Sequence, residues 1–163
     1  MKKSIVLSDG WVLKDCNTGQ EYPIPRMPMQ VHSILREHGV ISDNYIYGDT
    51  SDCRWVQEHE WQYTTNFICE EPEKIAYISI KGLDTFADVY LNGELVGSHE
   101  DFYLSARFDV TGRLKEQNTL SIYFRSVPEI LKECEARNPH PDRIKPYRMI
   151  RKNLSHFTYE RLD

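Results

Sequence analysis

Carboxylate and imidazole side chains are the groups in this chain whose types suit acid–base or metal chemistry. The 163-residue sequence holds 25 Asp and Glu residues and six His residues. No two histidines stand in an HxxxH or HExxH arrangement, so no helical zinc site is predicted. The GxGxxG, Walker A and GxSxG motifs are absent too, and we expect no cofactor. Most of so many carboxylates should be solvated surface charges, and the residues alone indicate no catalytic centre.

Aromatic side chains are the second group of candidates, because the C–H faces of pyranose rings pack against flat aromatic rings. The candidates are Trp55, Trp61, Tyr63, Tyr77, Tyr90, Tyr103 and Tyr123. Aromatic residues are common in strands and dominate β-sheet cores. Packing within a sheet is therefore the ordinary role for each of them, and sugar stacking is the alternative.

The cysteines are widely spaced. They are Cys16, Cys53, Cys69 and Cys134, and no two form a CxxC pair. Disulfides are rare in the cytosol, and this spacing is not that of a zinc site. Free thiols are the favoured interpretation.

Composition excludes several classes of partner. The net charge of −5 and a pI near 5.7 argue against nucleic acid or an anionic membrane, which both attract basic surfaces. No apolar run approaches the roughly 20 residues that cross a bilayer. Met1-Lys2-Lys3 precedes only a short apolar stretch, which is too brief for a signal peptide. These features predict a folded, cytoplasmic protein.

The segment from Gly82 to Gly97 predicts a β-hairpin. Ala87, Val89 and Leu91 alternate with polar positions, so one face can be buried. Asn92-Gly93 supplies two residues that tolerate the positive φ angles of a type I′ turn. Residues 94–97 then return as the partner strand.

Further short strands are expected along the chain, and two helices accompany them. The strands lie within 5–15 (two of them), 60–68, 74–80, 104–108 and 120–124, with turns at 111–112 and 117–118. This spacing is typical of an antiparallel sandwich or jelly roll, and residues 1–163 are expected to form one such domain.

The helices are predicted by apolar spacing and by their ends. Val31, Ile34, Leu35 and His38 share one helical face, and Gly39 suits a C-terminal cap. The second helix is expected to start at a capping box formed by Ser126 and Glu129, with Ile130, Leu131 and Cys134 as its apolar stripe.

Taken in order, short motifs across nearly the whole chain resemble the N-terminal sugar-binding-like domain of glycoside hydrolase family 2, in its β-mannosidase branch. The matching segments are 11–13, 25–35, 39–43, 54–56, 61–67, 82–97, 108–111, 118–120, 140–141, 151–152 and 156–157. The resemblance implies an all-β, galactose-binding-like jelly-roll β-sandwich of antiparallel strands with two short helices. In the family this domain precedes an immunoglobulin-like domain and a catalytic (β/α)₈ barrel.

The resemblance also implies where catalysis takes place. The family's two catalytic glutamates belong to the barrel, one of them within an Asn-Glu dipeptide, and this sequence has no Asn-Glu. Retaining hydrolysis requires both carboxylates. We therefore expect no catalytic residue here: a full-length parent would hydrolyse O-glycosyl bonds, and residues 1–163 alone would be inactive.

The tail carries the residues that the resemblance places near substrate. β-Mannosidases usually have His-Phe-Gly-Trp-Asp-Trp-Gly here, a segment that reaches the barrel's sugar subsite. This chain has His156-Phe157-Thr158-Tyr159-Glu160-Arg161-Leu162. His156, Tyr159 and Glu160 are the substrate-binding candidates, with Glu160 able to accept hydrogen bonds from sugar hydroxyls. The longer glutamate and the Thr158 and Arg161 departures leave the mannose specificity open.

Three functions remain to be compared. The first is a non-catalytic N-terminal domain, β-mannosidase-like, whose partners are the downstream domains of its parent chain and a β-linked sugar. The second is an autonomous carbohydrate-binding module that uses exposed tryptophans. The third is a purely structural or oligomerisation domain, and a homo-oligomer is compatible with all three.

Overall fold

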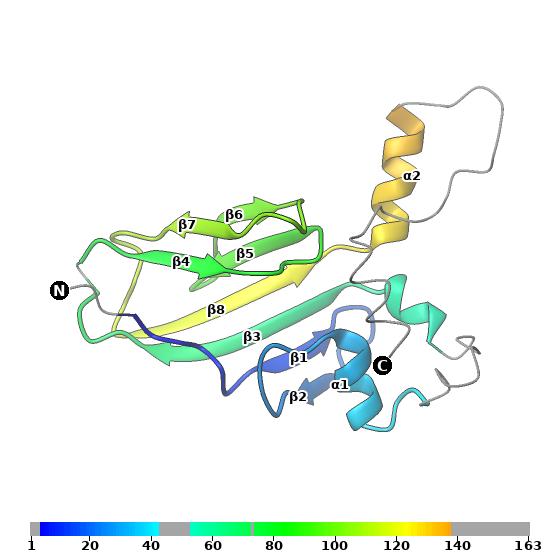
Figure 1. Cartoon of the computed structure of the whole chain (residues 1–163), viewed down its shortest axis with the longest axis horizontal. Coiled ribbons are helices and arrows are strands. Elements are labelled where there is room, and N and C mark those ends of the chain that lie inside the picture. Colours follow the sequence, from blue (N-terminus) through cyan, green and yellow to red (C-terminus); the bar gives the residue numbers. More distant parts are fainter. Residues whose placement is uncertain (1–3, 43–52, 73, 138–163) are drawn as a thin grey trace.

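The computed structural model describes residues 4–42, 53–72 and 74–137, which form a β-sandwich (Figure 1). A six-stranded antiparallel sheet has the order β2-β1-β3-β8-β5-β6, and a two-stranded sheet pairs β4 with β7. The strands are β1 (Val12–Asp15), β2 (Glu21–Pro23), β3 (Trp61–Ile68), β4 (Tyr77–Ile80), β5 (Ala87–Leu91), β6 (Glu94–His99), β7 (Ala106–Asp109) and β8 (Gln117–Phe124). The helices are α1 (Val31–Glu37) and α2 (Val127–Arg137), with a 3₁₀ turn, η2 (Arg54–Gln57). The expected antiparallel sandwich with two α-helices is confirmed.

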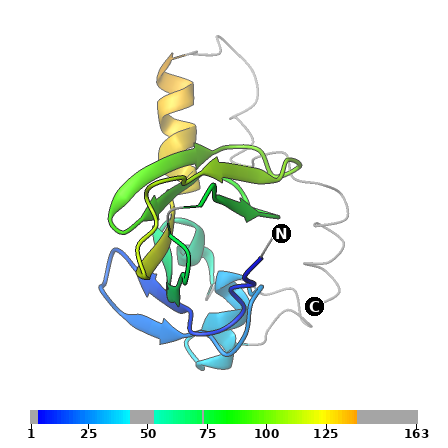
Figure 2. The same ribbon diagram turned by 90° about the vertical axis from the view of Figure 1, so that its left-hand side faces the viewer.

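Alternation along the strands of the large sheet builds the core. Side chains on the inner face are fully or almost fully buried, as in Leu13, Tyr63, Val89, Leu120 and Ile122. Helix α1 lies beside β1 and β2 and closes that end of the core (Figure 2). Its Ile34 and Leu35 have no exposed surface, which confirms the predicted apolar face.

The predicted hairpin is confirmed as β5 and β6, joined at Asn92 and Gly93. Both residues have positive φ, at 54° and 85°, as a type I′ turn requires. The Asn92 side chain has a second role that we call the Asn92 clasp. Its Nδ2 donates to Asn118 Oδ1 (3.0 Å) and to the Arg113 carbonyl (3.3 Å), while its Oδ1 accepts from the Thr119 N–H (3.0 Å). The clasp fixes the hairpin tip to the start of β8.

Several predicted boundaries are wrong. The chain before β1 is not a strand, because it curls so that the Trp11 indole donates to the Leu7 carbonyl at 2.9 Å. Strand β4 starts at Tyr77, three residues later than predicted. The 117–118 pair begins β8 instead of forming a turn, since Asn118 is buried in the clasp.

The predicted capping box at α2 is also wrong in its chemistry. Ser126 lies before the first helical residue as expected, but its buried Oγ has no hydrogen-bond partner. Glu129 accepts a hydrogen bond from Lys132 instead.

Gly97 of β6 allows β7 to pack against it. The ring of Phe108 occupies the space that a β-carbon at this position would need. We therefore expect Gly97→Ala to lower the free energy of unfolding by about 1–3 kcal/mol through overpacking. Urea denaturation measures the change.

A double-mutant cycle tests the cause of that loss. Phe108→Leu should relieve the clash, so the combined variant should be more stable than the sum of the two single losses predicts. Strictly additive losses would show that Phe108 is not the obstacle.

Candidate functional site

The substrate-binding residues predicted from the tail, His156, Tyr159 and Glu160, lie outside the described residues. The structure therefore places none of them. It does place all seven aromatic candidates and the buried titratable groups of the described ranges, and these define what the described part can do.

Most of the aromatic candidates pack within the protein. Trp61 and Tyr63 are 4% and 5% exposed, and the Tyr63 hydroxyl donates to the Met29 carbonyl (3.1 Å). Burial raises the pKa of Tyr63 far above its ordinary value. Trp55, Tyr90 and Tyr123 are half-buried. Packing, not sugar stacking, is what the geometry supports for these five.

Two candidates are exposed, Tyr77 on β4 and Tyr103 in the loop between β6 and β7. The Arg107 guanidinium lies 4.0 Å from the centroid of the Tyr77 ring, so one face of that ring is already covered by a cation–π contact. Tyr103 meets Phe102 edge to face, with the ring centroids 5.7 Å apart. Of the seven, Tyr103 presents the most surface.

A buried carboxylate–imidazole pair lies at the end of β1. Asp15 is 1% exposed and faces the core, and its Oδ2 accepts a 2.9 Å hydrogen bond from His59 Nδ1. Its Oδ1 accepts from the backbone N–H groups of Asn17 (2.9 Å) and Thr18 (3.3 Å). We call this arrangement the Asp15–His59 pair.

Two neighbouring tryptophan rings pack against the imidazole. Trp55 meets the His59 ring edge-on at 4.9 Å between centroids, and Trp61 lies nearly parallel to it at 6.2 Å. A carboxylate that orients an imidazole is also the geometry of a general base, but a base must reach a substrate proton. Here the two rings cover part of the imidazole, and the carboxylate that orients it is buried. The pair joins β1 to the chain that follows η2. The role of the Asp15–His59 pair is to stabilise the fold.

The pKa of Asp15 shows which form the protein stabilises. Burial by itself would raise that pKa, but the hydrogen bonds from His59, Asn17 and Thr18 outweigh it and hold it below the ordinary value of 3.8. Because the folded state binds fewer protons than the unfolded state, this stabilisation is present above about pH 4. It is lost as the pH falls through the folded pKa.

We expect the free energy of unfolding to fall more steeply between about pH 5 and about pH 3 in the natural chain than in an Asp15→Asn variant. Urea titrations at matched ionic strength measure both slopes. Equal slopes would show that Asp15 does not titrate on unfolding.

The outer face of the large sheet has a shallow polar hollow of about 270 Å³, lined by Gly10, Val12, Lys14, Glu21, Gln62, Thr64 and Asn66. The side chains of Gln62, Thr64 and Asn66 already pair with one another or with β8. Thr64 bonds Gln62 (3.2 Å) and Ser121 (3.1 Å), and Asn66 accepts from Thr119 (2.7 Å). A ligand that used these three side chains would compete with the bonds they already make.

All four cysteines lie in the described ranges and are free thiols. Burial, followed by the charge of Glu60, raises the pKa of Cys16, which keeps it protonated. Within the described residues no three His, Cys, Asp or Glu side chains gather as a metal site would require. No helix in the same ranges is long and apolar enough to cross a membrane.

Sequence reasoning missed both buried polar clusters. The sequence Asp-Cys-Asn-Thr-Gly from Asp15 to Gly19 is typical of a turn in which an aspartate accepts backbone hydrogen bonds. The role of Asp15 in this turn was therefore predictable. The imidazole partner lies 44 residues away, and no local pattern indicates it.

Comparisons with known proteins identify a family and several relatives. A family model described as "Glycosyl hydrolase 2 galactose-binding domain-like" matches residues 11–160. The β-mannosidase of Mus musculus is 31% identical over 147 residues, and β-mannosidase B of Emericella nidulans is 35% identical over 148 residues. These matches cover 88% and 84% of this chain but only 16% and 17% of the relatives.

Solved structures share the fold. The crystal structure of the β-D-mannosidase of Dictyoglomus thermophilum has a TM-score of 0.73 and 26% identity, over 86% of this chain and 18% of that one. The exo-chitosanase of Amycolatopsis orientalis has a TM-score of 0.60 at 19% identity, over 74% of this chain and 16% of that one, and supports the fold alone.

Proposed function

The chain belongs to the glycosyl hydrolase 2 galactose-binding domain-like family, and from that membership we propose that it is the non-catalytic N-terminal domain of a β-mannosidase-like glycoside hydrolase. One observation carries the proposal. Nearly the whole chain matches β-mannosidases at 31% and 35% identity, yet it spans only about a sixth of their length. The remaining length leaves room for a catalytic domain elsewhere in the parent chain.

The proposed role is structural support for catalysis performed by another domain. Retaining hydrolysis needs two carboxyl groups about 5 Å apart. Among the described residues Asp15 is the only buried carboxylate, and it is bonded to His59 and to two backbone amides. Because these hydrogen bonds already occupy the carboxylate, the described part of the chain is better suited to be a scaffold than an active site.

The tail supplies the proposed contact with substrate. His156, Tyr159 and Glu160 stand at the positions of the family's subsite motif. We propose that they line the pocket for a β-linked sugar, and that Glu160 accepts hydrogen bonds from two of its hydroxyls. The substrate class we propose is the β-mannoside.

Glu160→Ala in the full-length parent is expected to lower kcat/KM about tenfold to a hundredfold, because the reaction slows steeply when the substrate is misplaced. Steady-state hydrolysis of 4-nitrophenyl β-D-mannopyranoside measures it. Glu116→Ala, an exposed glutamate just before β8, is the matched control and should not change the rate. Unchanged kinetics in Glu160→Ala would remove the tail from the pocket.

The class of the parent has its own test. The parent should hydrolyse the β-mannoside faster than the matching β-glucoside and β-galactoside, and residues 1–163 alone should hydrolyse none. A parent without glycosidase activity would overturn the proposed function. The carbohydrate-module alternative relied on exposed tryptophans, and none of the three is exposed: Trp11 and Trp61 are buried and Trp55 is half-buried.

A further inference from the structure

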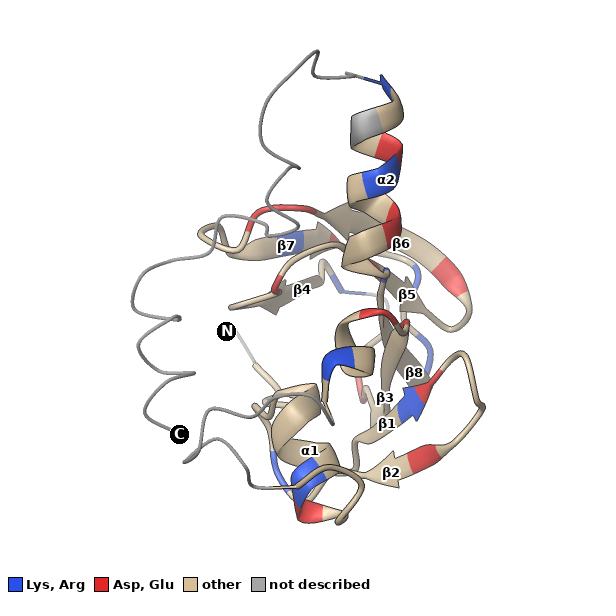
Figure 3. Cartoon of the chain, turned by 90° about the vertical axis from the view of Figure 1, so that its right-hand side faces the viewer, with Lys and Arg blue, Asp and Glu red and all other residues tan. Residues whose placement is uncertain are grey.

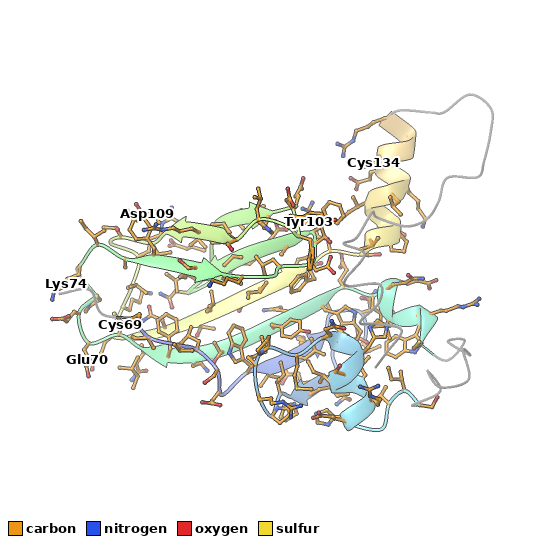
Figure 4. The ribbon with its side chains drawn as sticks, viewed as in Figure 1. Cys69, Glu70, Lys74, Tyr103, Asp109 and Cys134 are labelled. Carbon is orange, nitrogen blue, oxygen red and sulfur yellow. The ribbon has the colours of Figure 1, made fainter. Side chains whose placement is uncertain are left out.

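Three features meet at the end of the sandwich where β8 passes into α2. We call their apolar part the α2 corner: Tyr103 and Leu104 of the β6–β7 loop, and Ile130, Leu131 and Cys134 of α2. Figure 4 shows Tyr103 and Cys134 at this end of the molecule and Cys69 at the opposite end.

The first feature is the helix. α2 has 11 residues and projects from the sandwich (Figures 1 and 2). Helices this short are marginal in water unless an apolar face packs against something. Its charged residues pair along the helix, Lys132 with Glu129 and Arg137 with Glu133, and Figure 3 shows both signs on it. In the stripe Cys134 is exposed and Ile130 and Leu131 are half-buried, so part of its surface is open to a partner.

The second feature is the loop beside it. Tyr103 and Leu104 are 64% and 62% exposed. The loop is nevertheless held in a defined turn, because Asp101 Oδ1 accepts the Tyr103 N–H (2.8 Å) and the Asp101 carbonyl accepts the Leu104 N–H (3.3 Å). A preorganised loop that presents an aromatic and a leucine to solvent has the composition of an interface anchor.

The third feature is a set of polar atoms at the base of the corner. His99 Nε2 at the end of β6 and Ser126 Oγ at the start of α2 are buried and have no hydrogen-bond partner. Arg125 Nε is 3.6 Å from Asp88, close enough for an ion pair but not for a hydrogen bond. Buried polar groups are almost always hydrogen-bonded in complete structures. All the buried unpartnered side-chain atoms of the described residues lie at this junction, which is therefore the least completely hydrogen-bonded part of the described fold.

We propose that the α2 corner is the surface on which the downstream part of the parent chain docks, an inference that rests on the proposed function. The occupant follows from the relatives, in which about five-sixths of the chain lies outside the match. It would bring apolar side chains to the exposed Tyr103 and Leu104 and to the exposed side of α2.

The opposite end of the sandwich provides a matched control. Ile68 and Ile75 are 65% and 77% exposed there, so apolar exposure is similar. The described residues at that end include no projecting helix and no buried unpartnered polar atom. The two ends therefore differ in the features that carry the proposal.

The thiols at the two ends report on docking. Cys134 is exposed and Cys69 is half-buried. Alkylation by N-ethylmaleimide, followed residue by residue by mass spectrometry, should be at least about tenfold slower at Cys134 in the folded parent than in the 163-residue chain. The rate at Cys69 should be the same in both.

Variants assign the protection to the corner. Tyr103→Ala with Leu104→Ser in the parent should return the Cys134 rate towards that of the 163-residue chain, whereas Ile68→Ser with Ile75→Ser should not. Three outcomes would overturn the proposal. Cys134 could react equally in both proteins, Cys69 could be protected instead, or Cys134 could already be protected in the 163-residue chain by its own residues or a second copy.

The same samples separate this inference from the proposed function. An active β-mannosidase with an unprotected Cys134 would refute only the docking surface. A parent with a protected Cys134 and no glycosidase activity would refute only the function.

Discussion

Asp15→Ala is expected to lower the free energy of unfolding by about 3 kcal/mol, because it removes one partner of a buried carboxylate–imidazole pair. Asp15 is buried, and its carboxylate accepts hydrogen bonds from His59, Asn17 and Thr18. The truncation would leave those donors without their acceptor inside the fold. We expect the lower end of the range for buried pairs because the His59 side chain is 24% exposed and can be partly rehydrated. Urea denaturation at about pH 7 measures the loss.

Asp15→Asn is the control that separates charge from hydrogen bonding. The amide oxygen can still accept from a backbone N–H, so part of the stability should remain. A loss below about 1 kcal/mol for Asp15→Ala would mean that the pair is equivalent to an exposed ion pair. The structural role given to the Asp15–His59 pair would then be wrong.

Asn92→Ala is the second large prediction, with an expected loss of about 3–4 kcal/mol. In the clasp the Asn92 side chain donates two hydrogen bonds and accepts one, each worth about 1 kcal/mol net. Alanine must also adopt the left-handed backbone at φ 54°, at a cost of about 1 kcal/mol. Asn118, which is 3% exposed, would lose one of its partners. Thermal and urea unfolding of the two proteins measure the difference.

Asn92→Gly separates the clasp from the backbone. Glycine accepts the turn geometry without strain, so its loss should be about 1 kcal/mol smaller than that of alanine and should reflect the missing hydrogen bonds. A glycine variant as stable as the natural chain would show that Asn92 serves the turn alone.

Local features were predictable from the sequence because their causes are local. The β5–β6 hairpin follows from alternation and from the two residues that allow positive φ, and α1 follows from apolar spacing closed by Gly39. The predicted first and last residues of the strands were less accurate. The 117–118 pair has turn-forming letters, yet Asn118 is drawn into β8 because the clasp satisfies its side chain. The prediction of a capping box at Ser126 was also wrong, since the Ser126 hydroxyl is buried without a hydrogen-bond partner.

The sequence by itself determined the class of fold, the hairpin and the family, because alternation, turn residues and motif order are properties of the letters. Only the tertiary structure decided which polar residues matter to stability. Asp15 meets His59 across 44 residues and Asn92 meets Asn118 across 26, and chain folding alone creates those contacts. It also decided that none of the three tryptophans is exposed, whereas Tyr103, Leu104 and Cys134 of α2 are exposed at the same end of the sandwich. Burial depends on which elements pack against one another, and no short stretch of sequence contains that information.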